Sequence, residues 1–145
     1  MSSMNIMFVT SEAAPFAKTG GLADVCSALP KSLSKKNRVK VVMPLYSSID
    51  MVKYGITEYM HGCCVHMGNC EEFYSLYHAK DSGVDFYFIK FDKYFDRDGI
   101  YHTKAGEYGY NPYRFSFLSK AAFQVAKDLE FVPDIMHAND WQTAL

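Results

Sequence analysis

Short apolar runs flank a helical apolar stripe in the first third of the chain. Residues 5–10, NIMFVT, are largely apolar, rich in strand formers and followed by the turn-prone SEAAP, so they predict a buried strand. Residues 39–44, VKVVMP, predict a second one. Between them, apolar residues recur at the spacing of one helical face, at Leu22, Val25, Cys26, Leu29 and Leu33. The sequence thus predicts a β-α-β unit, in which Pro30 is expected to kink or end the helix.

The middle of the chain follows a different pattern. Residues 57–66, 71–80 and 84–91 are strand-like, and the turn sequences GN and DSG separate them. Strands joined by such short turns are typically antiparallel neighbours. The sheet is therefore expected to be mixed, with a parallel beginning and an inserted antiparallel meander.

A long segment without periodicity precedes the last elements. Residues 92–111 are rich in Gly, Asp and Tyr, which predicts a surface loop of the kind that often carries function. Asn111 can cap the next helix, with Pro112 at its first position. The apolar stripe of that helix is Phe115, Leu118, Ala122, Val125 and Leu129. Pro133 ends it, residues 134–138 predict a further strand, and Asn139 with Asp140 can cap a helix that begins at Trp141.

The last predicted strand has little sequence after it. A parallel strand normally has its following helix packed back on the sheet, whereas this sequence stops at Leu145. The 145 residues, a usual length for one domain, are therefore expected to be a piece of a longer domain. Such a piece exposes sheet edge and apolar surface, so self-association is expected.

The overall charge argues against a polyanionic partner. Lys plus Arg number 15 against 16 Asp plus Glu, a formal charge of −1, so nucleic acid is not an expected partner. No apolar run approaches the roughly 20 residues that span a bilayer, and the beginning of the sequence, MSSMNIMFVT, lacks the parts of a signal peptide. We expect a cytoplasmic protein without membrane contact.

The stretch HGCCVH, residues 61–66, raises the question of a metal site. On a strand, His61 and Cys63 face one way while Cys64 and His66 face the other, so the four side chains do not converge as zinc ligands do. Buried or half-exposed strand residues are the preferred interpretation, and neither a metal nor a cofactor is expected. The 4 cysteines form no CxxC pair, and reduced thiols fit the cytoplasm.

The first candidate site is the sequence KTGGLAD after the first strand. Gly20 and Gly21 let backbone amides approach an anion, and Lys18 supplies a positive charge. Asp24, in the first helical turn, can accept hydrogen bonds from sugar hydroxyls. A tight turn with a solvated Lys18 explains the same residues equally well. The stretch is neither GxGxxG nor a P-loop, which counts against a dinucleotide enzyme and a P-loop NTPase.

The second candidate site follows the last strand. His137, Asp140 and Trp141 offer a titratable ring, a carboxylate and an apolar platform suited to a sugar. The alternative is an Asp140 that only caps a helix and a Trp141 that belongs to the core, and taken alone this second cluster favours that alternative. Both clusters map to the carboxyl ends of strands, where open α/β sheets bind ligands.

Together the two clusters resemble one family. SEAAPFAKTGGLADVCSALPKSL is similar to the N-terminal signature of glycogen and starch synthases that use nucleotide-diphosphate glucose, and DIMHANDWQTAL is similar to their HAHDWH stretch. FDRDGIYH and YRFSFLSKAA also look like that family, so the resemblance covers essentially the whole chain. It implies an α/β fold: a Rossmann-like three-layer domain with a mixed sheet, the first part of the N-terminal domain of a GT-B glycosyltransferase. Residues 1–145 are then an incomplete domain, and the second domain is absent.

The resemblance also implies a reaction and a set of binding residues. The family transfers glucose, with retention of configuration, from ADP-glucose (sometimes UDP-glucose) to the non-reducing end of an α-1,4-glucan in glycogen biosynthesis. The residues implied at the donor phosphates are Lys18, Gly20 and Gly21. The residues implied to lie beside the glucosyl or acceptor subsites, or in the wall around them, are Asp24, Tyr101, His137, Asp140 and Trp141.

Some family residues differ or lie outside this sequence. Asn139 and Gln142 stand where the family has its second and third histidines, and neither amide can transfer a proton. The histidine that faces the transferred glucose, and the Arg, Lys and Glu that hold the diphosphate and assist transfer, belong to later sequence. No catalytic residue is therefore assigned, and this chain alone is expected to be inactive.

Two other functions remain open. One is a non-catalytic sugar- or glucan-binding module in which aromatic residues such as Tyr101 and Trp141 stack on sugars. The other is an oxidoreductase with a nucleotide cofactor. Two sequence features count against it: the glycine fingerprint is absent, and no acidic residue ends the second strand.

Overall fold

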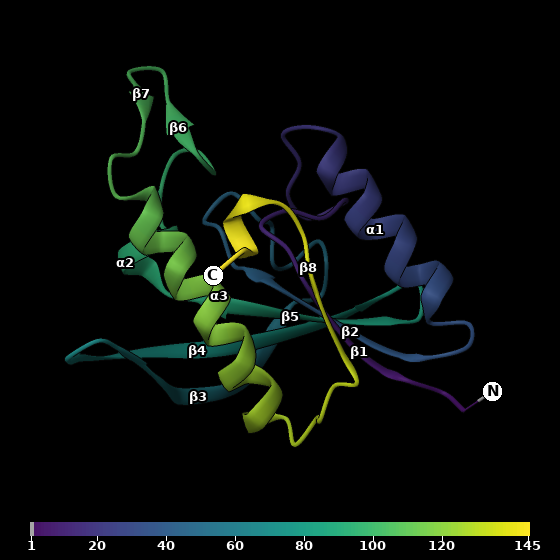
Figure 1. The fold of residues 1–145 in the computed structure, drawn as a ribbon. Coiled ribbons are helices and arrows are strands. Elements are labelled where there is room, and N and C mark those ends of the chain that lie inside the picture. Colours follow the sequence, from purple (N-terminus) through teal and green to yellow (C-terminus); the bar gives the residue numbers. More distant parts are fainter. Residues whose placement is uncertain (1) are drawn as a thin grey trace.

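The structure, a computed structural model, describes residues 2–145. These residues form a six-stranded sheet in the order β3-β4-β5-β2-β1-β8, together with a separate two-stranded ribbon (Figure 1). The sheet is mixed, because β2 pairs in parallel with β1 and β5, while β4 pairs antiparallel with β3 and β5. The α/β class and the mixed sheet predicted from the sequence are therefore confirmed.

The parallel half of the sheet contains the predicted β-α-β unit. Strand β1 (Asn5–Val9) leads through a loop to helix α1 (Gly21–Leu33), which returns the chain to β2 (Arg38–Pro44). Strand β8 (Ile135–Ala138) pairs in parallel with the other side of β1. Strand β1 therefore has a parallel neighbour on each side, and its carboxyl end lies between those of β2 and β8.

Two details of α1 differ from expectation. Of the two effects expected of Pro30, a kink or an end, the end does not occur, because the helix continues to Leu33, the last residue of the predicted stripe, with Pro30 among its buried residues. A proline costs a helix one backbone hydrogen bond, and here its ring lies in the packed face close to the end of the helix. Val25, expected in the apolar stripe, is 52% exposed. The buried face instead contains Ala23, Cys26 and Pro30.

The antiparallel half follows the predicted meander. It consists of β3 (Thr57–Met67), β4 (Cys70–Asp81) and β5 (Val84–Lys90). The pairing of β3 with β4 shifts register between Met60 and Cys63, and Gly62 there has a φ of +70°, a conformation that favours glycine. As a result His61 is exposed and Cys63 is buried. The expectation that these two side chains share one face of the strand is therefore wrong.

The segment before the last helix is only partly a loop. It contains the short helix α2 (Asp92–Phe95) and a ribbon of β6 (His102–Thr103) and β7 (Gly106–Glu107). Helix α3 (Asn111–Asp128) follows, and four of its five predicted stripe residues are buried, Leu129 being half-buried. Asn111 is not the N-cap, because α3 already includes it and Tyr110 occupies the cap position.

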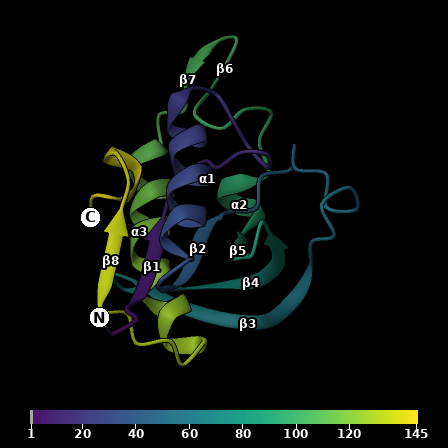
Figure 2. The same ribbon diagram turned by 90° about the vertical axis from the view of Figure 1, so that its right-hand side faces the viewer.

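The helices cover opposite faces of the sheet (Figures 1 and 2). Phe16, in the loop before α1, packs against Phe86 and Phe88 on one face. Phe117 of α3 packs against Tyr74, which β4 presents to the other face. This gives three layers, helix, sheet and helix. Among residues 2–145, no helix is both long and apolar enough to cross a membrane.

Candidate functional site

The candidate site lies where β1 and β8 end side by side. Val9 and Ala138 are paired at the carboxyl ends of these strands. The Asn139 side chain joins the two ends, because its Nδ2 donates to the carbonyl oxygens of Val9 and His137, each at 2.9 Å. The segments that leave both strands, residues 10–20 and 139–142, are thereby brought together, as the sequence predicted for two parallel neighbours.

A buried carboxylate, Glu12, holds the glycine loop. Glu12 is 1% exposed, and its Oε2 accepts a hydrogen bond from Thr19 Oγ1 at 2.6 Å. Its Oε1 accepts one from the Gly20 amide at 3.3 Å. Burying a carboxylate is costly unless donors surround it, so these contacts fix the loop conformation. The Gly20 amide is consequently engaged inside the protein, while the first amides of α1, from Gly21 on, have no partner within the helix.

Tyr101 connects the 92–110 segment to this carboxylate. Its hydroxyl lies 3.1 Å from Glu12 Oε2 and 2.7 Å from Ser11 Oγ. Burial raises the pKa of Tyr101, the Ser11 hydrogen bond partly opposes this, and the charges of Glu12 and Asp140 raise it further. The phenol therefore stays protonated at neutral pH and can donate to Glu12.

The two charged candidates, Lys18 and Asp24, are paired with each other. Lys18 Nζ lies 2.7 Å from each Asp24 carboxylate oxygen. Their side chains are 53% and 58% exposed, so the pair is a weak one in water. An incoming anion can therefore recruit Lys18 at small cost. It would do so in front of the N-terminus of α1, where the helix dipole also favours negative charge.

The glycine pair is not explained by packing within the described residues. Gly20 has extended backbone with φ −157°, and no described atom lies within 4 Å of a Cβ built on Gly20 or Gly21. Neither a positive φ nor an internal contact therefore requires glycine here. The space that a Cβ would occupy is open, which fits the predicted close approach of a ligand to the backbone.

The second cluster forms an aromatic corner beside the loop. Asp140 has a φ of +64°, and its Oδ1 accepts from the Trp141 amide at 2.7 Å, which caps the turn η1 (Trp141–Thr143). Trp141 is 53% exposed, and its ring centroid lies 6.3 Å from Tyr101 and 5.3 Å from Phe115. The predicted cap at Asp140 is confirmed. Trp141 is not a core residue, because about half of its surface is exposed.

His137 is separate from these polar contacts. Its ring stacks on Phe8 of β1 with centroids 4.4 Å apart and planes at 9°. Its Nδ1 is buried without a hydrogen-bond partner among residues 2–145. Gln142 is 4% exposed, and its backbone oxygen accepts a hydrogen bond from Ser119 of α3. Asn139 and Gln142 thus hold the strand end and the turn in place.

Arg114 of α3 anchors the segment that carries Tyr101. It is fully buried, and it donates to the carbonyl oxygens of Tyr94 (2.6 Å) and Ile100 (2.8 Å) and to Asn111 Oδ1 (2.8 Å). Asn111 Nδ2 in turn donates to the Tyr101 carbonyl at 2.9 Å. Because residues on both sides of the loop depend on this guanidinium, Arg114 fixes where Tyr101 lies.

Sequence reasoning missed Glu12 and Arg114. Glu12 carried a signal, since it is an acidic residue between an apolar strand and a glycine pair, at the strand end where ligands bind. Arg114 carried none, because a single arginine in the first turn of a helix is usually solvated. Its burial depends on contacts with residues up to 20 positions earlier.

Comparison with known proteins agrees with this arrangement. The sequence model of the starch synthase catalytic domain matches residues 5–145. The chain belongs to the starch synthase catalytic domain family. It is 40% identical over 143 residues to a glycogen synthase of Geotalea daltonii and 41% identical over 144 residues to one of Oceanobacillus iheyensis.

These matches cover nearly all of this family member but only part of its relatives. The aligned regions take in 98% and 97% of this chain, and 30% and 29% of the two glycogen synthases. Among solved structures, the catalytic domain of starch synthase IV from Arabidopsis thaliana, bound to ADP and acarbose, is similar with a TM-score of 0.86 and 27% identity. That likeness covers 99% of this chain and 29% of the plant chain.

Proposed function

We propose that this chain forms the donor-side wall of a retaining glucosyltransferase that elongates glycogen. In this proposal the enzyme has a GT-B architecture and moves glucose from ADP-glucose, or UDP-glucose, to the non-reducing end of an α-1,4-glucan. The observation that carries it is the convergence, in a member of this family, of the glycine loop, Tyr101 and the Asp140–Trp141 turn at the ends of β1 and β8.

The glycine loop is assigned to the donor diphosphate. The first amides of α1, beginning at Gly21, and the Lys18 ammonium supply oriented positive charge at an open backbone. Charge placed where the leaving nucleotide becomes more negative stabilises the transition state more than the ground state. Gly20 acts through its hydrogen bond to Glu12, which keeps the loop in position.

The remaining candidates are assigned to the sugar. The carboxylates of Asp24 and Asp140 can accept hydrogen bonds from sugar hydroxyls, and the exposed face of Trp141 gives a stacking surface. Tyr101, held between Ser11 and Glu12, borders the same corner. His137, which lies three residues before Asp140 and stacks on Phe8, is assigned to the wall around it. The similar Arabidopsis catalytic domain is bound to ADP and acarbose, which supports a nucleotide and a saccharide as the ligands.

Two further features belong to the proposal. All four cysteines in the described residues are free, and reduced thiols fit a cytoplasmic enzyme.

Apolar side chains of α3, of β8 and of their flanks are exposed, namely Phe123, Val132, Ile135 and Leu145. Strand β8 is also an edge strand of the described sheet. The 145-residue chain by itself is therefore expected to self-associate.

The test is glucose transfer by a full-length protein that carries this chain. Purified enzyme is incubated with glycogen and radiolabelled ADP-glucose or UDP-glucose, and labelled glycogen is counted. We expect transfer by the full-length protein and none by the 145-residue chain. A full-length protein that binds glycogen but transfers glucose from neither donor would overturn the proposal and favour a glucan-binding module.

A further inference from the structure

The hairpin of β3 and β4 presents a second cluster of chemically active side chains. It lies at the opposite edge of the sheet from β8. On one face of the hairpin, Cys63 and Val65 are buried. The alternating residues Cys64 and His66 therefore point to the other face, and the strand register places Glu71 directly opposite His66.

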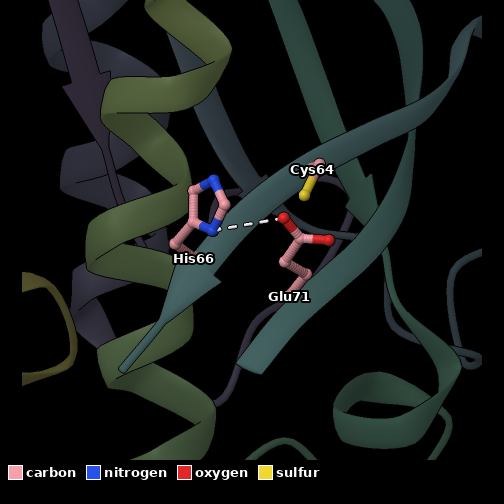
Figure 3. Close-up of side chains that lie close together, drawn as sticks. All are labelled: Cys64, His66 and Glu71. Atoms are coloured by element: carbon pink, nitrogen blue, oxygen red, sulfur yellow. Dashed lines mark ion pairs between the residues drawn. The ribbon is translucent and has the colours of Figure 1, made fainter. Parts of the chain in front are cut away.

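Three different ligand atoms converge on that outer face. The sulfur of Cys64, a ring nitrogen of His66 and a carboxylate oxygen of Glu71 all lie within 4.8 Å of one another. His66 Nδ1 and Glu71 Oε1 are 3.5 Å apart. Figure 3 shows Cys64 and His66 on one strand and Glu71 on its neighbour, with the sulfur and the carboxylate directed toward each other.

We propose that Cys64, His66 and Glu71 form a binding site for a zinc-like divalent cation. Zinc bonds of 2.0–2.3 Å in tetrahedral geometry require ligand atoms about 3.3–3.8 Å apart, which small rotations of these half-buried and exposed side chains reach. Sulfur, imidazole and carboxylate together suit zinc and its neighbours, whereas magnesium and calcium select oxygen alone. The three residues leave the fourth position to water.

The charge beside the sulfur agrees with a cation there, since a carboxylate oxygen of Glu71 lies within 4.8 Å of it. A cation between the Cys64 thiolate and this carboxylate offsets the repulsion between them, and its binding releases the thiol proton. The bound ion would cross-link β3 to β4 near their turn and brace the strand at the edge of the sheet. This cation site does not depend on the proposed glucosyltransferase function.

The experiment is a titration of the full chain with Co²⁺ as a spectroscopic substitute for zinc, in a buffer without thiol reductants. A cobalt-thiolate bond gives a charge-transfer band in the near ultraviolet, and tetrahedral geometry gives intense visible bands. We expect both, saturating at one ion per chain and removed by added Zn²⁺. Cys64→Ser should abolish the charge-transfer band. His66→Ala or Glu71→Gln removes a direct ligand and should weaken binding by at least the roughly 10- to 100-fold that loss of an outer-shell partner costs.

Matched controls separate this site from chance binding. Cys70→Ser removes an exposed thiol beside Glu71 that alternation places on the other face, and His61→Ala removes an exposed histidine of the same strand. Both variants should bind like the wild type. A charge-transfer band that survives Cys64→Ser or is lost in Cys70→Ser would overturn the proposal. So would the absence of thiolate-bound cobalt from a folded wild-type chain, as judged by circular dichroism.

Discussion

Lys18 Nζ lies 2.7 Å from both carboxylate oxygens of Asp24, six residues along the chain. Lys18, which is proposed to bind the donor phosphates, is thus paired with Asp24, which is proposed to bind the sugar. In the proposed function, binding of a nucleotide diphosphate sugar would therefore exchange one partner of Lys18 for another. The two residues are expected to affect the nucleotide and the sugar in different ways.

Replacement of Asp24 by Asn should separate these effects. An exposed ion pair contributes about 0.2–1 kcal/mol, so a freed Lys18 should let ADP inhibit up to about fivefold more strongly. The KM for ADP-glucose should rise instead, because a sugar hydroxyl loses its acceptor. Initial rates of the full-length enzyme measure both, with Asp92→Asn, which breaks the exposed Lys90–Asp92 pair, as the control. Weaker inhibition by ADP would show that Asp24 does not restrain Lys18.

Glu12→Gln should loosen the glycine loop. The variant keeps the volume but places amide hydrogens against the donors of Thr19, Gly20 and Tyr101. An unsatisfied buried polar group costs about 1–3 kcal/mol, so the free energy of unfolding measured in urea should fall by that amount. Glu107→Gln, at an exposed residue of β7, should change nothing. Equal stability of the two variants would show that the hydrogen bonds of Glu12 do not hold the glycine loop in position.

Arg114→Lys should free the 92–110 segment. Lysine keeps the charge but lacks the planar fork that reaches three acceptors, and we expect a loss of about 3 kcal/mol in stability. Trypsin should then cut faster after Lys93, Arg97 or Lys104. Lys120→Arg, at an exposed position of the same helix, is the matched variant. An unchanged cleavage rate in Arg114→Lys would mean that other contacts hold the segment.

Alkaline pH should destabilise the protein partly through Cys63. Burial of the thiol, and to a smaller extent the negative charge of Asp128, raise the pKa of Cys63 from 9.0 to about 11. The unfolded chain therefore loses the proton first, and stability falls as the pH rises from 9.0 toward 11. In Cys63→Ala the slope of unfolding free energy against pH should be shallower in this window, whereas exposed Cys70→Ala should keep the wild-type slope. Identical slopes in all three proteins would contradict the assignment.

The elements with clear periodicity were predictable from the sequence, and so was the sheet edge at which the two candidate clusters lie. The strands and the stripe of α3 follow from apolar spacing, and Asp140 caps Trp141 as its residue type indicates. The stripe also placed Leu33 in α1, but it did not show that the helix would pass Pro30 without ending there. Local propensity disfavours proline there, but Pro30 is buried close to the end of the helix, and tertiary context overrides propensity.

Contacts between distant segments explain what was missed in the site. Tyr101 reaches Glu12 across 89 residues, and no local pattern shows that these two side chains meet. The proposed cation site has the same origin. Cys64 and His66 were visible as a pair on one face, but Glu71 joins them only through the register of the neighbouring strand.

The most direct test of the central claim is the effect of Lys18→Ala on inhibition by ADP in the full-length enzyme. Loss of a charge-assisted hydrogen bond to a phosphate costs about 1.5–3 kcal/mol, so the ADP inhibition constant should rise about 10- to 100-fold. Lys31→Ala, in the last turn of α1 and far from its N-terminus, should leave it unchanged. An unchanged inhibition constant in Lys18→Ala would contradict the assignment of the glycine loop to the donor phosphates.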